Sequence, residues 1–167
     1  MQFETTVQID APVEAVWAAL VDVRRWPEWT ESMQDVGWLD DDSLRVGARA
    51  RIKQLGTPAL TWTVTELDEG RAFAWEASSP GVTTVGTHAV SAAGEDGSRL
   101  TLGLQQSGAL AWLIGAFTGA RTRRFVQMEA DGLKRAAECA SAEATADRGT
   151  DSAEATGDAG EVRPAAG

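Results

Sequence analysis

Histidine, cysteine and tyrosine are scarce in this sequence of 167 residues, which holds one histidine (His88), one cysteine (Cys139) and no tyrosine. A single cysteine cannot form an internal disulfide, and it is typical of a reducing compartment. One histidine and one cysteine at unrelated positions exclude a metal site built on clustered His and Cys side chains. The absence of tyrosine excludes acid catalysis by a phenol. Neither a GxGxxG nor a P-loop pattern occurs, so we predict no metal and no cofactor.

Long apolar runs and an excess of basic charge are also missing. The longest nearly uncharged apolar run, residues 109–120, is much shorter than the roughly 20 residues that span a bilayer. The first residues, MQFETTVQID, lack the basic and apolar regions of a signal peptide. A net charge of −10 disfavours binding to phosphate backbones. We therefore expect a cytoplasmic protein with no integral membrane segment and no nucleic-acid partner; its oligomeric state is left open.

The end of the sequence differs in composition from the rest. From Cys139 onward it consists mainly of small and acidic residues, with no aromatic residue and one branched aliphatic residue, Val162. Such a segment cannot bury enough apolar surface to offset the entropy lost on ordering. We predict one domain over residues 1–138 and a disordered, acidic, Ala/Gly-rich tail over residues 139–167.

The remaining pattern predicts a strand, two short helices, several strands and a long helix. Residues 2–9 alternate as a half-buried strand, and a helix begins near Pro12. Pro27 ends that helix or begins another, which makes residues 23–32 a helical elbow. Further strands are expected at 36–39, 44–55, 60–67, 71–77, 82–90 and 98–106, and a long amphipathic helix at 110–138. The short turns between the strands require antiparallel pairing.

Two segments carry a resemblance to a known family. Residues 9–29, IDAPVEAVWAALVDVRRWPEW, and residues 86–102, GTHAVSAAGEDGSRLTL, resemble the START-like (SRPBCC) superfamily, in particular the polyketide cyclase/dehydrase and lipid-transport family. The resemblance implies an α+β helix-grip fold. In that fold a curved antiparallel sheet of about seven strands wraps around a long C-terminal helix, and two short helices follow the first strand. It also implies a cavity between sheet and helix that binds apolar or amphipathic small molecules.

Two interpretations apply to the aromatic and apolar side chains that would face this cavity. Trp26 and Trp29, on either side of Pro27 and Glu28, either fill the core at the elbow or border the cavity mouth. Trp62, Phe73 and Trp75 are either core or cavity wall. The full set of candidate ligand-binding residues is Trp26, Trp29, Ala50, Trp62, Phe73, Trp75, His88, Leu102, Leu104, Gln106, Leu110, Leu113, Ile114 and Phe117.

His88 is the one candidate catalytic residue, and its orientation depends on the parity of its strand. It faces the cavity if Gly86 and Val90 face inward, where it could act as a general base or a hydrogen-bond donor. It faces solvent if Val85, Thr87 and Ala89 face inward. A basic row formed by Arg45, Arg49, Arg51 and Lys53 is either the solvated face of a strand or a contact for an anionic membrane or an acidic partner.

These observations support three hypotheses for function. The first is a START-like binding module for a lipid or polyketide-like molecule, oriented by His88 or Gln106. The second is an enzyme of the polyketide cyclase/dehydratase type that uses the same cavity, with His88 moving a proton. The third is a protein-interaction module, regulatory or toxin-like, with a filled core.

Overall fold

A computed structural model describes residues 1–41 and 43–154 of the chain, except the side chains of residues 113–115, 117 and 148–154. The elements, in order, are β1 (Gln2–Ile9), α1 (Val13–Val21), the 3-10 turn η1 (Val23–Arg25), α2 (Trp26–Trp29), β2 (Met33–Trp38), β3 (Arg49–Gln54), β4 (Leu60–Asp68), β5 (Ala72–Ser79), β6 (Val82–Ala92), β7 (Ser98–Ser107) and α3 (Ala111–Glu154).

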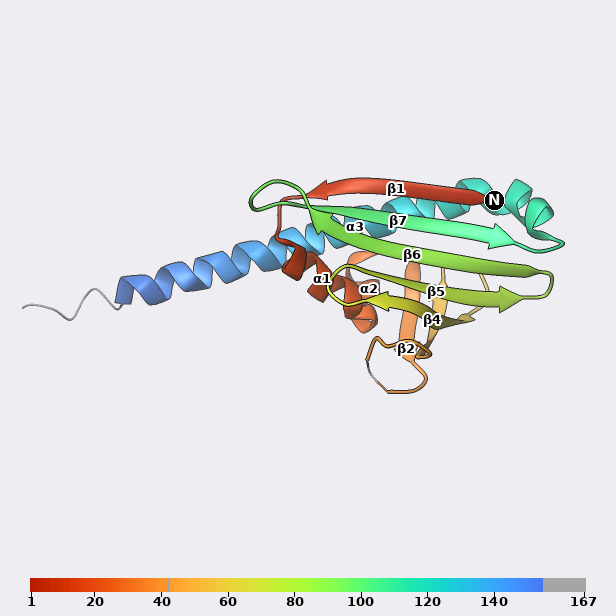
Figure 1. The fold of residues 1–167 in the computed structure, drawn as a ribbon, viewed down its shortest axis with the longest axis horizontal. Coiled ribbons are helices and arrows are strands. Elements are labelled where there is room, and N and C mark those ends of the chain that lie inside the picture. Colours follow the sequence, from red (N-terminus) through yellow and green to blue (C-terminus); the bar gives the residue numbers. More distant parts are fainter. Residues whose placement is uncertain (42, 155–167) are drawn as a thin grey trace, which may run out of the picture.

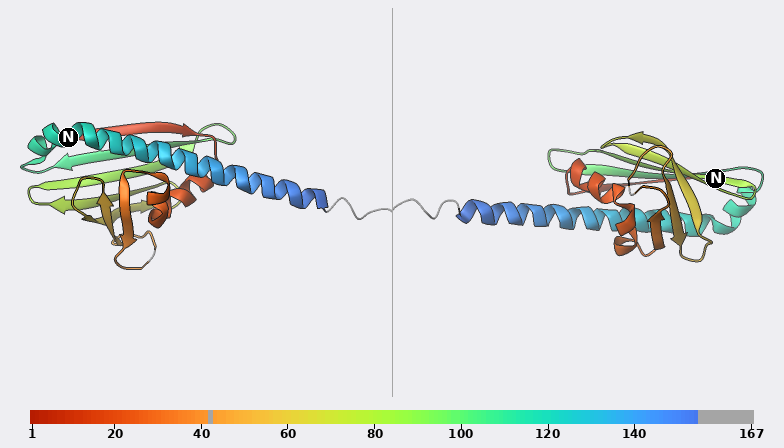
Figure 2. Two further views of the ribbon diagram at one scale, coloured as in Figure 1. Left: turned by 180° about the vertical axis from the view of Figure 1, so that it is seen from behind. Right: turned by 90° about the horizontal axis from the view of Figure 1, so that it is seen from below.

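The strands form one antiparallel seven-stranded sheet in the order β1-β7-β6-β5-β4-β3-β2. Helix α3 runs along one face of this sheet, and α1 and α2 lie beside it at one end (Figures 1 and 2). The predicted α+β helix-grip fold is therefore confirmed. One face of the sheet is curled around α3, and this concave side holds the cavity described below.

The residues around Pro27 form the predicted elbow between the first helix and the sheet. Proline occupies the first turn of α2, where its missing N–H group costs no hydrogen bond. The Trp26 carbonyl accepts a hydrogen bond from the N–H group of Thr30, where α2 ends. The Trp26 indole Nε1–H donates to the Leu20 carbonyl oxygen at 3.1 Å, which ties the elbow to the end of α1. The side chain of Trp26 is thereby fixed inside the protein.

An aromatic cluster joins this elbow to the middle of the sheet. The Trp26 ring lies 5.2 Å from Trp75 and 5.5 Å from His88, between ring centroids. Phe73 stacks on His88 with centroids 4.3 Å apart and planes 10° from parallel. Edge-to-face and offset contacts of this kind are favourable beyond the area they bury. The cluster makes this end of the sheet–helix interior solid.

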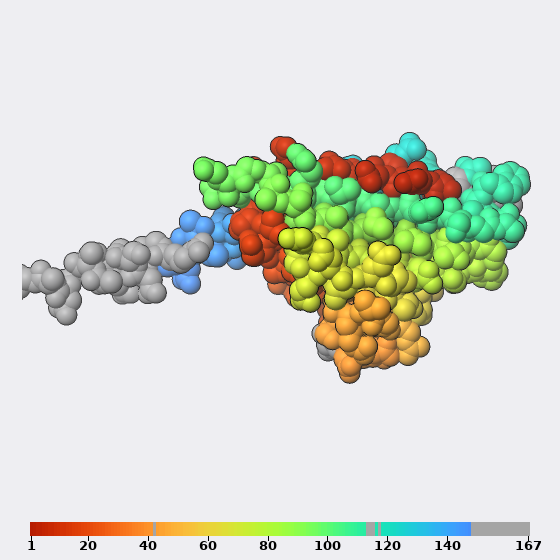
Figure 3. Space-filling model, in the orientation of Figure 1, coloured from red at the N-terminus to blue at the C-terminus, as the bar shows by residue number. Residues whose placement is uncertain are grey.

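Strand β3 is shorter than its sequence pattern predicted. The alternation from Leu44 suggested a strand over residues 44–55, whereas β3 begins at Arg49. The preceding residues form a turn at Gly47, whose positive φ of 85° suits glycine, and Val46 is 58% exposed. Figure 3 shows the β2–β3 connection as part of a lobe that projects from one edge of the molecule. Leu44, Val46 and Ala48 alternate as in a strand, but they lie in the connection before β3.

Three residues of the predicted basic row face solvent and pair with carboxylates, whereas the fourth, Lys53, is half-buried and donates to the Thr57 carbonyl. Arg45, Arg49 and Arg51 form ion pairs with Asp41, Asp40 and Asp35, at 2.9, 2.9 and 3.1 Å. The Arg49 side chain, through its hydrogen bond to Asp40, holds the pKa of that carboxyl below its usual value. Paired and solvated charges of this kind fit the simpler of the two interpretations.

Helix α3 extends beyond the end predicted for it. It continues as helix from Cys139 to Glu154, where the composition had suggested disorder, and residues 155–167 lie outside the description. Alanine and glutamate favour helix even without packing, and residues 142–147 are exposed. The division into a domain over 1–138 and a tail stays a prediction. Within the described part of the chain, no helix combines the length and apolar character needed to cross a membrane.

Candidate functional site

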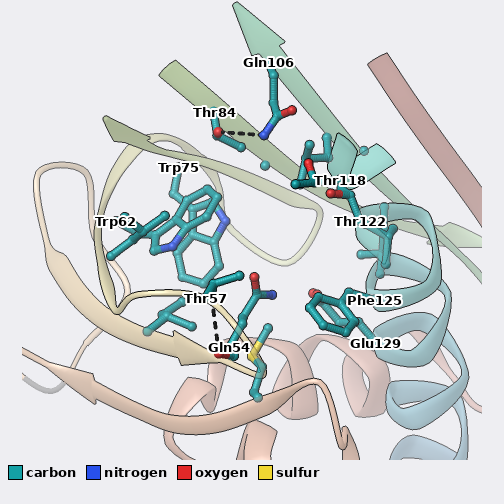
Figure 4. A pocket seen from close by; sticks show the side chains of 18 of the residues that line it. Gln54, Thr57, Trp62, Trp75, Thr84, Gln106, Thr118, Thr122, Phe125 and Glu129 are labelled. Atoms are coloured by element: carbon teal, nitrogen blue, oxygen red, sulfur yellow. Dashed lines mark hydrogen bonds between the residues drawn. The ribbon is translucent and has the colours of Figure 1, made fainter. Parts of the chain in front are cut away.

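A cavity of about 300 Å³ lies between the concave face of the sheet and α3. Figure 4 shows Trp62 and Trp75 on the sheet side and Thr118, Thr122, Phe125 and Glu129 on the α3 side. The apolar lining residues are Met33, Ile52, Pro58, Leu60, Trp62, Trp75, Val82, Leu102, Leu104, Phe125 and Val126. The polar ones are Gln54, Thr57, Ser79, Thr84, Thr87, His88, Gln106, Thr118, Arg121, Thr122 and Glu129, with Gly86 and Gly103 completing the wall.

The exposed residues among this lining locate the mouth of the cavity. Pro58, Ser79 and Arg121 are exposed at this rim, whereas His88 and Glu129 are buried; Thr87, also exposed, lies on β6 at the parity opposite to His88. The Arg121 guanidinium reaches across to the Gly56 carbonyl, 3.5 Å away, and links α3 to the β3–β4 turn. The cavity therefore runs from this rim toward a buried polar pair.

Six of the predicted ligand-binding residues lie on the cavity wall. They are Trp62, Trp75, His88, Leu102, Leu104 and Gln106. In each case the side chain belongs to the inward-facing set of β4, β5, β6 or β7, as alternation along a strand requires. These positions satisfy the geometric part of the prediction, and their contact with a ligand stays a prediction.

The other predicted site residues lie elsewhere. Trp26 and Phe73 are buried in the aromatic cluster, and Ala50 is buried in the core. Trp29 borders a separate hollow, together with Glu31 and Arg135. For Trp26, the core interpretation is the one that its burial supports.

The first turns of α3 were predicted to line the cavity, and Leu110 does not. It precedes α3, is 44% exposed, and packs over Gly81 in the β5–β6 turn. The side chains of Leu113, Ile114 and Phe117 lie outside the described residues.

The register of β6 determines the orientation of His88. Val82, Thr84, Gly86, His88 and Val90 form the buried set of this strand. At Gly86 the Trp75 indole covers the strand. It occupies the space where a side chain would stand, since an added Cβ would lie 2.7 Å from Trp75 Nε1. The ring of His88, 5% exposed, therefore lies on the concave side.

Two side-chain atoms in this region, one on Gln106 and one on His88, lack hydrogen-bond partners among the described residues. Gln106 Nε2 donates to Thr84 Oγ1 at 3.4 Å, while Gln106 Oε1 is buried without a partner among the described residues. His88 Nδ1 is likewise buried and unpartnered. His88 Nε2 lies 3.1 Å from Glu129 Oε1 on α3. Unpaired polar atoms in an interior are costly, and both of these belong to residues that line the cavity.

Sequence reasoning missed the contribution of the middle of α3 to the wall. Thr118, Thr122, Phe125, Val126 and Glu129 recur at spacings of three and four residues. This stripe is typical of one helix face. A pattern of apolar residues does not reveal this stripe, because three of its five members are polar. Within the described residues, no group of three or more His, Cys, Asp or Glu side chains is placed to hold a metal ion.

Comparisons with known proteins agree with this architecture. The family model described as polyketide cyclase/dehydrase and lipid transport matches residues 1–138. A search of curated proteins found no match. A Thermus thermophilus protein, TTHA0849, is 17% identical with a TM-score of 0.69, over 84% of this chain and 99% of that one.

Two further solved structures share the fold. Norcoclaurine synthase from Thalictrum flavum, in complex with dopamine and hydroxybenzaldehyde, is 11% identical with a TM-score of 0.64, over 81% of this chain and 84% of that one. The di-domain ARO/CYC protein BexL, from the BE-7585A biosynthetic pathway, is 20% identical with a TM-score of 0.62, over 80% of this chain and 46% of that one. Identities this low establish a common fold and nothing about the ligand.

Proposed function

The chain belongs to the polyketide cyclase/dehydrase and lipid transport family, and from that premise we propose that it binds a hydrophobic or amphipathic small molecule of lipid or polyketide-like chemistry. The observation that carries the proposal is the cavity itself. Its wall combines the indoles of Trp62 and Trp75 with other apolar side chains and with polar residues from the sheet and α3. Ligand sites generally have this composition, because apolar contact supplies affinity and a few polar groups fix orientation.

The cavity volume limits the size of the enclosed part of the ligand. At about 300 Å³ it is roughly twice the volume of an engineered protein cavity, about 150 Å³, that admits benzene. A compound of two fused rings, or a short acyl segment, matches this space. A longer molecule would extend past Pro58 and Arg121 at the mouth.

Solved structures of the same fold support the proposal by analogy. One of them holds dopamine and hydroxybenzaldehyde, and another is an ARO/CYC protein of a biosynthetic pathway. We also propose a cytoplasmic location, which the single cysteine supports.

A test uses naphthalene-sized probes and a variant that fills the cavity. Calorimetric titration of the full chain with 2-naphthol should give saturable binding at one site. Leu104→Trp should weaken binding at least about tenfold, because the indole would occupy the space of the ligand. The matched control is Gln105→Trp, which places the same side chain at the next position of β7, on the exposed side. Unchanged binding by the Leu104 variant would refute the proposal.

A cyclase or dehydratase acting in the same cavity is a second candidate, favoured by the pairing of His88 with Glu129. An imidazole oriented by a carboxylate is an arrangement that transfers protons, as condensation or water loss in a β-polyketone would require. Formation of an aromatic product, followed by its absorbance, would measure such activity. His88→Ala should abolish it while the cavity still binds 2-methylnaphthalene. Turnover that persists in this variant would exclude His88 as the acid or base.

A further inference from the structure

The buried pair of His88 and Glu129 is the most polar feature of an otherwise largely apolar interior. The two side chains are 5% and 10% exposed and come from different elements, β6 and α3. Both also line the cavity. Removing two ionisable groups from water is expensive, so a pair of this kind needs compensating contacts.

His88 Nε2 and Glu129 Oε1 lie 3.1 Å apart. When Glu129 is a carboxylate it only accepts, and His88 in the tautomer with its hydrogen on Nε2 is then the donor. The stacked ring of Phe73 holds the imidazole plane from one side. The carboxylate is thereby held in one orientation.

The second oxygen of Glu129, Oε2, has no hydrogen-bond partner among the described residues. Figure 4 shows Glu129 beside Phe125, on the side of α3 that faces the cavity. The basic residue on the same wall, Arg121, is eight positions earlier, which is about 12 Å along a helix, and its guanidinium contacts Gly56 at the mouth. Neither His88 nor Arg121 therefore supplies Oε2 with a donor.

We propose that Glu129, held by His88, selects ligands that carry a hydrogen-bond donor, a hydroxyl or N–H group, on an aromatic or aliphatic body. The proposal rests on the proposed function and adds a specificity-determining residue to it. A donor on the ligand would satisfy Oε2, whereas an apolar isostere would cover this oxygen without offering it a donor. Sites that hydrogen-bond a ligand hydroxyl discriminate strongly against the analogue that lacks it, for this reason.

The test compares two ligands of nearly equal shape, 2-naphthol and 2-methylnaphthalene, by calorimetry with the full chain at neutral pH. The wild-type protein should prefer 2-naphthol by about tenfold or more, since hydrogen bonds to a charged acceptor are the strong ones. Glu129→Gln keeps the size and an oxygen for His88 but replaces the free oxygen with an NH₂ group. The preference should then fall to within about threefold, mainly through weaker binding of 2-naphthol.

Glu143→Gln is the matched control, because it makes the same substitution at an exposed position of α3. It should retain the wild-type preference. If the wild type binds both ligands equally, or if Glu129→Gln keeps the preference, the selective role of Glu129 is refuted and the binding function stands. If neither ligand binds the wild type, both proposals fail together.

Discussion

The close contact of α3 with α2 leads to a prediction with an unusual sign. In a helix interior, Gly→Ala normally stabilises by about 1 kcal/mol. At Gly132, however, an added Cβ would lie 2.2 Å from the Trp29 carbonyl oxygen and 3.0 Å from its carbon. These are backbone atoms, so the two helices would have to separate by roughly 1 Å to restore ordinary contact. Overpacking of this kind costs about 1–3 kcal/mol.

Combining the two terms, we expect Gly132→Ala to lower the free energy of unfolding by up to about 2 kcal/mol. For a chain of this size that corresponds to a fall of about 4–8 °C in Tm. Urea unfolding followed by tryptophan fluorescence measures the change directly, because Trp29 lies at this contact and its ring packs against Trp26.

Gly119→Ala is the control within the same helix. There, among the described residues, the added Cβ would meet the Met1 sulfur, 3.3 Å away at the end of a flexible side chain. The variant should be as stable as the wild type or gain up to about 1 kcal/mol. If Gly132→Ala proves equally stable, the inferred packing of α3 against α2 is incorrect.

Three further expectations follow from particular contacts. Gly86→Ala should displace the Trp75 indole, whose Nε1 would lie 2.7 Å from the new Cβ, and should weaken 2-naphthol binding severalfold; unchanged affinity by calorimetry would contradict the assigned wall. Burial raises the pKa of Glu138, but the hydrogen bonds from Lys134 and the Asp10 N–H group and the Lys134 charge outweigh it, so the net pKa is lowered. This stabilisation is present above the unfolded-state value and is lost as pH falls through the folded one. Wild type should therefore lose stability relative to Glu138→Gln below about pH 5, as acid titrations of the two urea midpoints would show. Deleting residues 142–167 should leave the urea midpoint unchanged, because residues 142–147 are exposed, and a clear fall would overturn the predicted domain boundary.

Strands β1 and β7 could be predicted from the sequence almost to the residue. In β1, Phe3, Thr5, Val7 and Ile9 share one face, and the strand spans Gln2–Ile9 as expected. In β7, Leu100 and Leu102 are buried on the predicted side. Period-two alternation is strong evidence where one face is covered and the other is wet.

The orientation of β6 could not be predicted, because both of its faces carry apolar residues. Val82 and Val90 belong to the buried set, and Val85, at the opposite parity, is half-buried. Gly86 lies on the inward face of β6, although a glycine gives no hydropathy signal for either face. Its missing side chain makes room for Trp75, a contact between neighbouring strands that no local pattern records.

The packed face of α3 is hard to locate in the sequence for a related reason. Leu110 is exposed, and among the α3 residues whose side chains are described the buried apolar ones are Ala111, Val126, Ala130, Leu133 and Ala137. Alanine contributes little to a hydrophobicity count, although it is the residue that allows a helix to approach a sheet closely. Because the packed face contains several alanines, its hydropathy signal in the sequence is weak.

Glu129 lies in this face, three residues after Val126 and four before Leu133, so its position alone predicts an inward side chain. An inward carboxylate is tolerable only with a hydrogen-bond donor opposite it. The chain offers one histidine, on a strand whose parity was open, and the inward parity of His88 supplies that donor. The orientation of His88 is ambiguous when its strand is considered alone. The requirement that a buried carboxylate have a hydrogen-bond donor relates it to the orientation of Glu129. The remaining oxygen of Glu129 has no hydrogen bond from the described residues, on a side chain that lines the cavity.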